Sequence, residues 1–114
     1  MNQNLEREIN QLHAQFCSGL ADPKRLLIIY TLAEGPRNVS DLAETLKLSQ
    51  PAVSRHLKVL RERGMVNANR VGAAVEYSLV DPRLVEALDI LRAILASNIK
   101  SQAALIDNAA AENL

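Results

Sequence analysis

Apolar residues recur at helical spacing in five segments of the chain. In residues 3–19, Leu5, Ile9, Leu12 and Phe16 lie three or four positions apart, with charged and amide side chains between them. Similar spacing recurs after residue 22, over 39–46, over 50–63 and from 82 to about 108. The pattern predicts five helices, each with an apolar side that must be buried against another part of the protein.

The period changes to two after the fourth of these segments. Apolar and polar residues alternate over 66–80, with Gly72 in the middle. This alternation predicts two strands joined by a turn, so a β-hairpin directly follows the fourth helix. The expected fold class is mainly α with a β-hairpin, and residues 1–114 are expected to form a single winged helix-turn-helix domain with five helices.

Polar residues and glycines mark where the predicted helices begin and end. Ser, Asp or Asn side chains can accept a hydrogen bond from a free amide at a helix start, proline fits the first turn, and glycine permits a left-handed stop. These signals are Asp22-Pro23, Asn38, Ser49 with Pro51, Gly64, and Asp81-Pro82.

The helix of residues 50–63 has two unlike faces. Val53, Leu57 and Leu60 form an apolar stripe, whereas the remaining surface carries groups that can hydrogen-bond a base edge or a phosphate. The short helix before it and the two-residue break at Lys47-Leu48 complete a helix-turn-helix over 39–63. We interpret 50–63 as a recognition helix for double-stranded DNA, with the hairpin of 66–80 as its wing; an ordinary solvated helix face and a solvated hairpin arginine are the alternatives. The predicted DNA-binding residues are Ser49, Gln50, Ser54, Arg55, His56, Lys58, Arg61 and, near the hairpin tip, Arg70. Arg63 is also expected near a phosphate.

Charge is distributed unevenly, although the chain of 114 residues has a net charge of zero, with 13 basic and 13 acidic residues. Residues 22–80 contain nine Lys and Arg against six Asp and Glu, whereas the two ends carry an acidic excess. This distribution favours a middle that meets phosphate and ends that meet another protein.

The last predicted helix is too long for one small domain to cover. At about 1.5 Å per residue, some 25 residues extend to roughly 37 Å, and an apolar stripe follows most of that length. We therefore predict a homodimer formed through helices 3–19 and 82–108. Two recognition helices roughly 34 Å apart would then enter successive major grooves of DNA.

No apolar run reaches the roughly twenty residues that cross a bilayer, and the N-terminal residues are polar, so we expect a cytoplasmic protein with neither a signal peptide nor a membrane contact. Cys17 is the only cysteine, which excludes a disulfide within the chain. The sequence contains neither a paired-carboxylate or Ser/His/Asp set nor a phosphate-binding glycine loop, so we expect no enzyme.

Five short motifs stand out in combination. They are Leu20-Ala-Asp-Pro-Lys-Arg-Leu26, Val39-Ser-Asp-Leu-Ala43, Leu48-Ser-Gln-Pro-Ala-Val-Ser-Arg-His-Leu-Lys-Val-Leu60, Gly64-Met-Val66 and Val75-Glu-Tyr-Ser-Leu79. Together they are similar to the ArsR/SmtB family of winged-helix transcriptional repressors, over about residues 10–95. The resemblance implies a dimeric repressor that binds an inverted-repeat operator and leaves it when an inducer is sensed. It also implies that Gln50, Ser54, Arg55 and His56 lie nearest the bases.

The sequence departs from the family at its metal sites. Many members bind a soft ion through Cys-x-Cys at the start of the third helix, where this chain has Asn38 and Ser40. A second family site on the last helix uses an Asp and His residues; Asp81 matches it, but its other positions hold Arg83, Ile94 and Ser97. We therefore expect no metal and no cofactor at these sites, and the effector stays unidentified.

A third departure is Lys47, which stands where many relatives have glycine in the turn of the helix-turn-helix. A positive φ at a lysine would cost roughly 1 kcal/mol without abolishing the fold.

His13 and Cys17 are the remaining candidates for a metal or redox role, because they lie four residues apart in the first helix. A buried cysteine and a surface histidine are the simpler interpretation. Two alternatives to an operator-binding repressor stay open: a repressor that responds to oxidants or reactive sulfur through Cys17, and a winged-helix protein interaction module that does not bind DNA.

Overall fold

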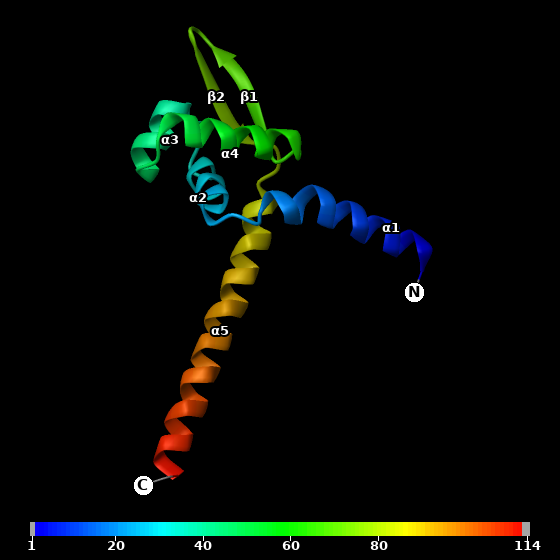
Figure 1. Ribbon diagram of the computed structural model, residues 1–114, viewed down its shortest axis with the longest axis vertical. Coiled ribbons are helices and arrows are strands. Elements are labelled where there is room, and N and C mark those ends of the chain that lie inside the picture. Colours follow the sequence, from blue (N-terminus) through cyan, green and yellow to red (C-terminus); the bar gives the residue numbers. More distant parts are fainter. Residues whose placement is uncertain (1, 113–114) are drawn as a thin grey trace. The chain divides into compact units, whose positions relative to one another are not determined.

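The computed structural model describes residues 2–112, which form five α-helices, one π-helix and one hairpin (Figure 1). Residues 1, 113 and 114 of the predicted domain lie outside the described range. The chain divides into two compact units, residues up to 82 and residues from 83 onward. In chain order the elements are α1 (Gln3–Leu12), η1 (the π-helix His13–Cys17), α2 (Pro23–Leu32), α3 (Val39–Leu46), α4 (Gln50–Glu62), β1 (Val66–Val71), β2 (Ala74–Leu79) and α5 (Arg83–Glu112).

The predicted helix starts are confirmed by their side-chain caps. The Asp22 carboxylate accepts the Lys24 amide at 2.8 Å, the Asn38 side chain accepts the Asp41 amide at 2.8 Å, and the Ser49 hydroxyl accepts the Ala52 amide at 3.2 Å. Each cap satisfies an amide that has no partner within its own helix. The three helices of the first unit that pack together therefore begin where short polar side chains require them to begin.

Three left-handed residues set the turns around the helix-turn-helix and the hairpin. Lys47 ends α3 with a φ of 56°, and its amide donates to the carbonyls of Ala43 and Glu44. Gly64 (φ 75°) follows the end of α4, and Gly72 (φ 63°) opens the hairpin turn. A left-handed backbone is free of strain at glycine but costs roughly 1–2 kcal/mol at a residue with a side chain, so Lys47 is strained as predicted.

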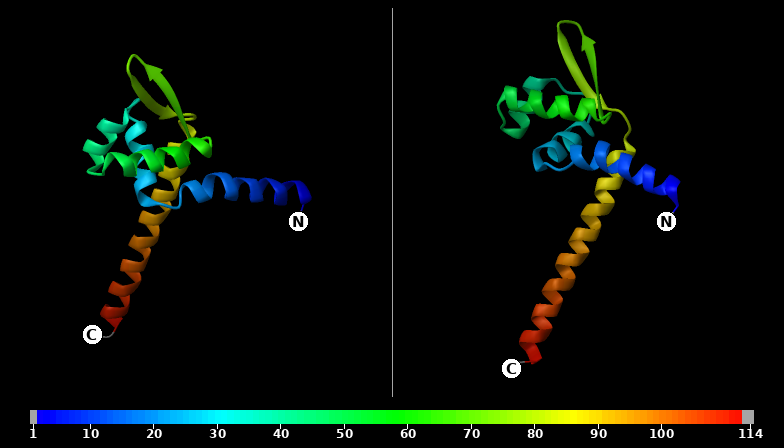
Figure 2. Two further views of the ribbon diagram at one scale, coloured as in Figure 1. Left: turned by 45° about the horizontal axis from the view of Figure 1, so that its top comes forward. Right: turned by 45° about the vertical axis from the view of Figure 1, so that its right-hand side comes forward.

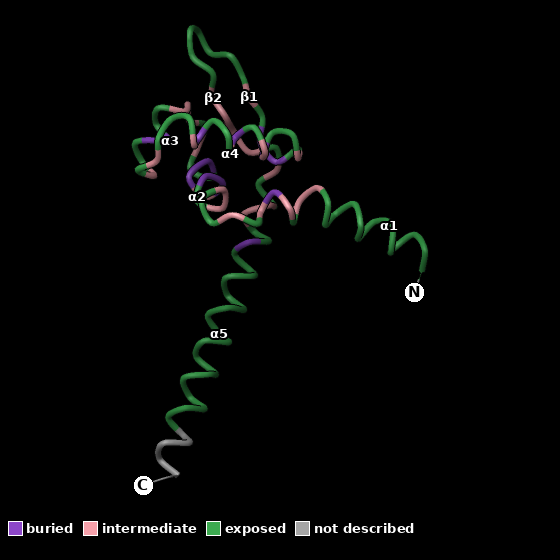
Figure 3. Tube along the Cα trace, viewed as in Figure 1, coloured by how far each residue is buried: buried purple, intermediate pink, exposed green. Residues whose placement is uncertain are grey.

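Helices α2, α3 and α4 pack against one another and against the base of the hairpin, which extends beyond them (Figures 1 and 2). The buried apolar residues of this unit come from all three helices and from the segment that enters the hairpin (Figure 3). They are Ile28, Ile29 and Leu32 of α2, Leu42 and Ala43 of α3, Val53, Leu57 and Leu60 of α4, and Met65 and Val66.

Strands β1 and β2 pair antiparallel, from Val66 opposite Leu79 to Val71 opposite Ala74. This register confirms the predicted wing. The sequence did not predict one further pairing, in which the Arg37 amide donates to the Tyr77 carbonyl at 3.0 Å and the Tyr77 amide donates to the Arg37 carbonyl at 2.7 Å. The loop before α3 is thus hydrogen-bonded to β2, which fixes the base of the wing.

The first and last helices differ from their predicted bounds. The predicted helix over 3–19 is an α-helix only to Leu12 and continues as the π-helix η1. Helix α5 begins at Arg83, one residue after the predicted start, and extends to Glu112. In the described part of the chain, no helix combines the length and the apolar character that crossing a bilayer requires.

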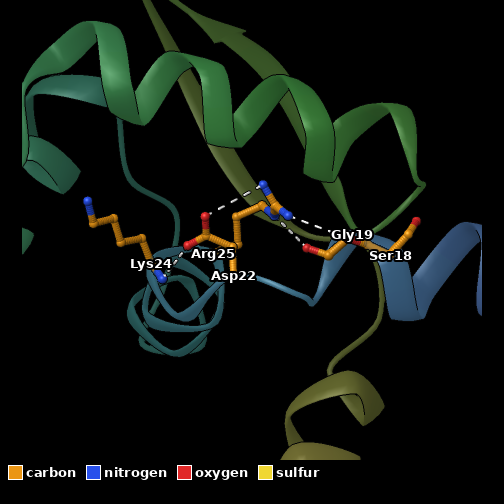
Figure 4. A network of polar contacts seen from close by, with 5 residues as sticks. All are labelled: Ser18, Gly19, Asp22, Lys24 and Arg25. Atoms are coloured by element: carbon orange, nitrogen blue, oxygen red, sulfur yellow. Dashed lines mark hydrogen bonds and ion pairs between the residues drawn. The ribbon is translucent and has the colours of Figure 1, made fainter.

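Arg25 connects the end of the first helical segment to α2 (Figure 4). Its Nε donates to the Gly19 carbonyl at 2.6 Å, and its guanidinium also lies 4.0 Å from the Asp22 carboxylate. Gly19 itself is buried, and a side chain there would collide with the methyl group of Met65. The close packing of Gly19 against Met65 and the contacts of Arg25 with Gly19 and Asp22 therefore fix the shape of this segment.

The cap at Asp22 makes stability depend on pH. The hydrogen bond from the Lys24 amide lowers the pKa of Asp22 below its ordinary value of 3.8; desolvation opposes this, and the positive charges of His56 and Arg25 assist it. Because its pKa is lower in the folded state, the ionised carboxylate of Asp22 stabilises the fold at pH values above 3.8. This contribution is lost as pH falls through the lowered pKa of the folded state. We expect wild type to melt a few degrees above Asp22→Asn at pH 7 and the gap to close as pH falls below the lowered pKa of the folded-state carboxyl. Circular dichroism melts would contradict the assignment if the gap is the same at both pH values.

Candidate nucleic-acid interface

The two faces of α4 differ sharply in exposure. Val53, Leu57 and Leu60 have exposed fractions of 0%, 1% and 0%, so the predicted apolar stripe is the inner face of the helix. The polar positions of its opposite side reach solvent (Figure 3). Those positions are Ser49, Gln50, Ser54, Arg55, Lys58 and Arg61, and Arg70 on β1 is exposed as well.

The exposed cations of α4 and the wing have no partner in the described part of the chain. Arg55, Lys58, Arg61 and Arg70 make neither an ion pair nor a side-chain hydrogen bond there. Other arginines are used internally: Arg37 pairs with Glu34 at 3.2 Å, and Arg25 binds the carbonyl of Gly19. Four free cations therefore lie where the sequence places the recognition helix and its wing.

The start of α4 is connected to α3 through Gln50. Its Nε2 donates to the Ser40 hydroxyl at 3.3 Å, which brings the first turns of the two helices together. The amide oxygen of Gln50 keeps its acceptor capacity in this arrangement. Gln50 is thus oriented by its neighbour while it remains exposed.

A groove of about 440 Å³ lies between α4 and β2. Three of its lining residues belong to the polar face of α4 that the sequence predicted, namely Ser54, Lys58 and Arg61. The sequence did not single out two further lining residues: Tyr77, whose phenol can hydrogen-bond, and Glu62, whose charge repels phosphate. Tyr77 reads as an ordinary strand residue in sequence, and only the packing of β2 beside α4 reveals its position. The full lining is Ser54, Leu57, Lys58, Arg61, Glu62 and Tyr77.

His56 differs from the other predicted site residues. It is half-buried, and its charge helps to lower the pKa of Asp22 at the start of α2. His56 therefore lies on the flank of α4 that is nearer α2, away from the most exposed side of the helix.

Arg63, which follows the polar face of α4 in sequence, does not belong to that face. Its guanidinium donates to the carbonyl of Ala14, and its own carbonyl accepts a hydrogen bond from Gln15 Nε2 at 3.1 Å. The prediction that Arg63 contacts a phosphate is wrong, because its guanidinium is hydrogen-bonded to the π-helix η1.

His13 and Cys17 are both exposed at the two ends of η1. The interpretation of Cys17 as a buried apolar residue is therefore wrong. Among the residues that the structure describes, His, Cys, Asp and Glu form no group of three or more that could hold a metal ion.

The model for bacterial regulatory proteins of the ArsR family matches residues 22–68, which contain α2, α3, α4 and the start of β1. The HTH-type transcriptional regulator NmtR of Mycobacterium tuberculosis is 43% identical over 83 residues, covering 70% of this chain and 69% of NmtR. A probable mercury resistance operon repressor of Streptomyces lividans is 38% identical over 85 residues, covering 75% of this chain and 68% of that protein.

A solved structure resembles the chain over most of its length. The crystal structure of Rv0081 from M. tuberculosis matches it with a TM-score of 0.75 and 34% sequence identity. The match covers 83% of this chain and 96% of that one. The likeness therefore extends well beyond the helix-turn-helix segment.

Proposed function

Because the chain belongs to the ArsR family of bacterial regulatory proteins and is a DNA-binding transcriptional repressor, we propose that it binds an inverted-repeat operator as a homodimer through the outer face of α4 and the wing. Membership confirms the family resemblance that the sequence predicted. Its family consists of transcriptional regulators and not of enzymes. The proposal places the repressor in the cytoplasm, where bacterial DNA lies.

The concentration of free cations on one surface carries this proposal. Arg55, Lys58, Arg61 and Arg70 are exposed and unpaired in the described structure, so each can release counterions from DNA by approaching a phosphate. A protein interaction module that does not bind DNA has no need for such a surface. In this proposal Ser49, Gln50, Ser54 and Arg55 read base edges, whereas Lys58, Arg61 and Arg70 hold the backbone. His56 has a supporting role, because it is half-buried.

Exposed apolar residues on α1 and α5 support the homodimer. Ile9 is 48% exposed on α1, and Leu91 and Leu95 are 60% and 59% exposed on α5. Side chains of this kind favour burial against a partner at about 25 cal/mol per Å² of apolar surface. A two-fold interface that uses both helices would cover these side chains in both subunits. The exposed large apolar residues of the two helices are Leu5, Ile9, Leu12, Ile90, Leu91, Ile94, Leu95, Ile99, Leu105 and Ile106.

Substitution of Arg55 tests the assignment of the outer face. We expect Arg55→Ala to cost about 1–3 kcal/mol of operator binding and to relax the preference at one base-pair position of each half-site. The operator for this test is selected by the wild-type protein from a random duplex library and compared with the DNA upstream of its own gene. Binding of every single-base operator variant is then measured by fluorescence anisotropy.

Arg7→Ala is the matched control, because Arg7 is an exposed arginine on the polar side of α1, outside the proposed DNA-binding face. It removes the same charge and should leave the preference at every position unchanged. If Arg55→Ala keeps wild-type discrimination among the operator variants, Arg55 does not read a base.

A further inference from the structure

Lys47 has the only left-handed backbone among the described residues other than glycine. Its φ of 56° allows the sharp turn between α3 and α4, and its amide closes α3 by donating to the carbonyls of Ala43 and Glu44. Glycine or asparagine makes the same turn with less strain. The turn itself therefore does not explain why a lysine occupies this position. Strained residues of this kind are found most often at functional sites.

The side chain of Lys47 is exposed and has no partner within the described structure. Glu44 lies three residues earlier at the end of the same helix, yet the two make no ion pair. The ammonium group thus adds no internal contact that would offset the backbone strain. Its charge is available to a molecule outside the protein.

The position of Lys47 identifies the class of that molecule. It precedes Ser49, the cap of α4, by two residues, so it lies at the entry to the helix whose exposed face carries Gln50 and Arg55. Phosphates that flank a base-reading helix are commonly held by side chains and amides at the start of that helix. We propose that Lys47 is a further DNA-contacting residue, whose ammonium binds a backbone phosphate beside the start of α4. This inference rests on the proposed function of the same face.

Three substitutions at Lys47 separate its charge from its backbone. Lys47→Gly removes both the charge and the strain, Lys47→Gln removes the charge and keeps the strain, and Lys47→Arg keeps both. Each full-length variant is titrated with the selected operator and with a 30-bp random-sequence duplex between roughly 50 and 200 mM salt. Thermal melts are recorded in parallel.

We expect Lys47→Gly and Lys47→Gln to raise the operator Kd about tenfold at physiological salt, because a dimer loses two phosphate contacts. The slope of log K against log salt should become shallower by about two for the dimer, and binding to the random duplex should weaken equally. Lys47→Arg should bind within about twofold of wild type. Lys47→Gly should melt about 3 °C higher than wild type, so that a protein with a more stable fold binds DNA less well.

Wild-type affinity and salt slope in both Lys47→Gly and Lys47→Gln would overturn the inference while leaving the proposed function intact. Weaker binding in Lys47→Gly alone would also overturn it, because the effect would then come from the backbone and not from the charge. Failure of the wild-type protein to bind either duplex would instead overturn the proposed function.

Discussion

Leu95→Glu should convert the protein into a monomer and remove its high-affinity binding to the operator. Leu95 is 59% exposed and lies on the same stripe of α5 as Leu91, four residues before Ile99. In the proposed dimer the substitution buries two uncompensated carboxylates in the interface. We expect the dimer Kd to rise at least about 100-fold, which corresponds to about 3 kcal/mol.

The effect on DNA follows from the loss of the second subunit. A dimer that has bound one half-site presents its other recognition helix at a high local concentration, whereas a monomer does not. Operator affinity of Leu95→Glu should therefore fall toward the affinity for a single half-site. Sedimentation equilibrium gives the association state, and anisotropy titrations give the DNA affinity.

Ala93→Glu provides the control, because Ala93 is an exposed residue two positions before Leu95 and shares the polar side of α5 with Asp89 and Lys100. It introduces the same charge and should leave the dimer and its operator affinity unchanged. A dimeric Leu95→Glu variant with wild-type affinity would show that the stripe of α5 does not form the interface.

Leu57→Ala should lower the stability of the fold, whereas Lys58→Ala should weaken DNA binding, although the two residues are neighbours in α4. Leu57 is 1% exposed, and truncation of such a residue leaves a cavity that costs about 2–5 kcal/mol of folding free energy. That is a large share of the roughly 5–15 kcal/mol that stabilises a small domain. Lys58 is exposed and unpaired, so its loss should change stability by less than about 0.5 kcal/mol.

DNA binding should be weakened more by Lys58→Ala than by Leu57→Ala. At a temperature where both variants are folded, Lys58→Ala should weaken binding uniformly across sequences and reduce the salt slope by about one per subunit. Leu57→Ala should keep the wild-type slope, because it removes no charge. Urea unfolding and salt-dependent titrations measure the two properties. Equal losses of stability in the two variants would contradict the assignment of an inner and an outer face.

The sequence predicts the two faces of α4 because both depend on local spacing. Val53, Leu57 and Leu60 recur at the helical period, and a stripe of that kind is buried wherever the helix packs. The caps at Asn38 and Ser49 are equally local, since each side chain bonds an amide within the next three residues. Helix starts, the helix-turn-helix and the hairpin could therefore be predicted without knowledge of the packing.

The sequence could not predict which cations are free, because this depends on contacts between distant segments. Arg63 and Arg61 look alike in the chain, yet Arg63 binds the carbonyl of Ala14, 49 residues away. The pairing of Arg37 with Tyr77 is similarly distant and leaves no periodic trace in the sequence. Selection of DNA-binding candidates by residue type and exposed face therefore included one arginine that the structure uses internally.

The π-helix η1 also had no signal in the pattern. Leu12 and Phe16 are four residues apart, which an α-helix and a single wide turn satisfy equally well. The carbonyl of Ala14, inside this turn, accepts hydrogen bonds from the Ser18 hydroxyl at 2.6 Å and from Arg63. The irregular turn is therefore supported by side chains, one of which comes from the end of α4.

The most direct test of the account is the DNA that the full-length protein selects from a random duplex library, followed by footprinting on the enriched sequence. The account predicts an inverted repeat whose half-site centres lie about 10 bp or a multiple of it apart, bound by two chains that protect successive major grooves on one side of the duplex. Enrichment of a single unrepeated site, protection by one chain alone or the absence of any enriched sequence would contradict it.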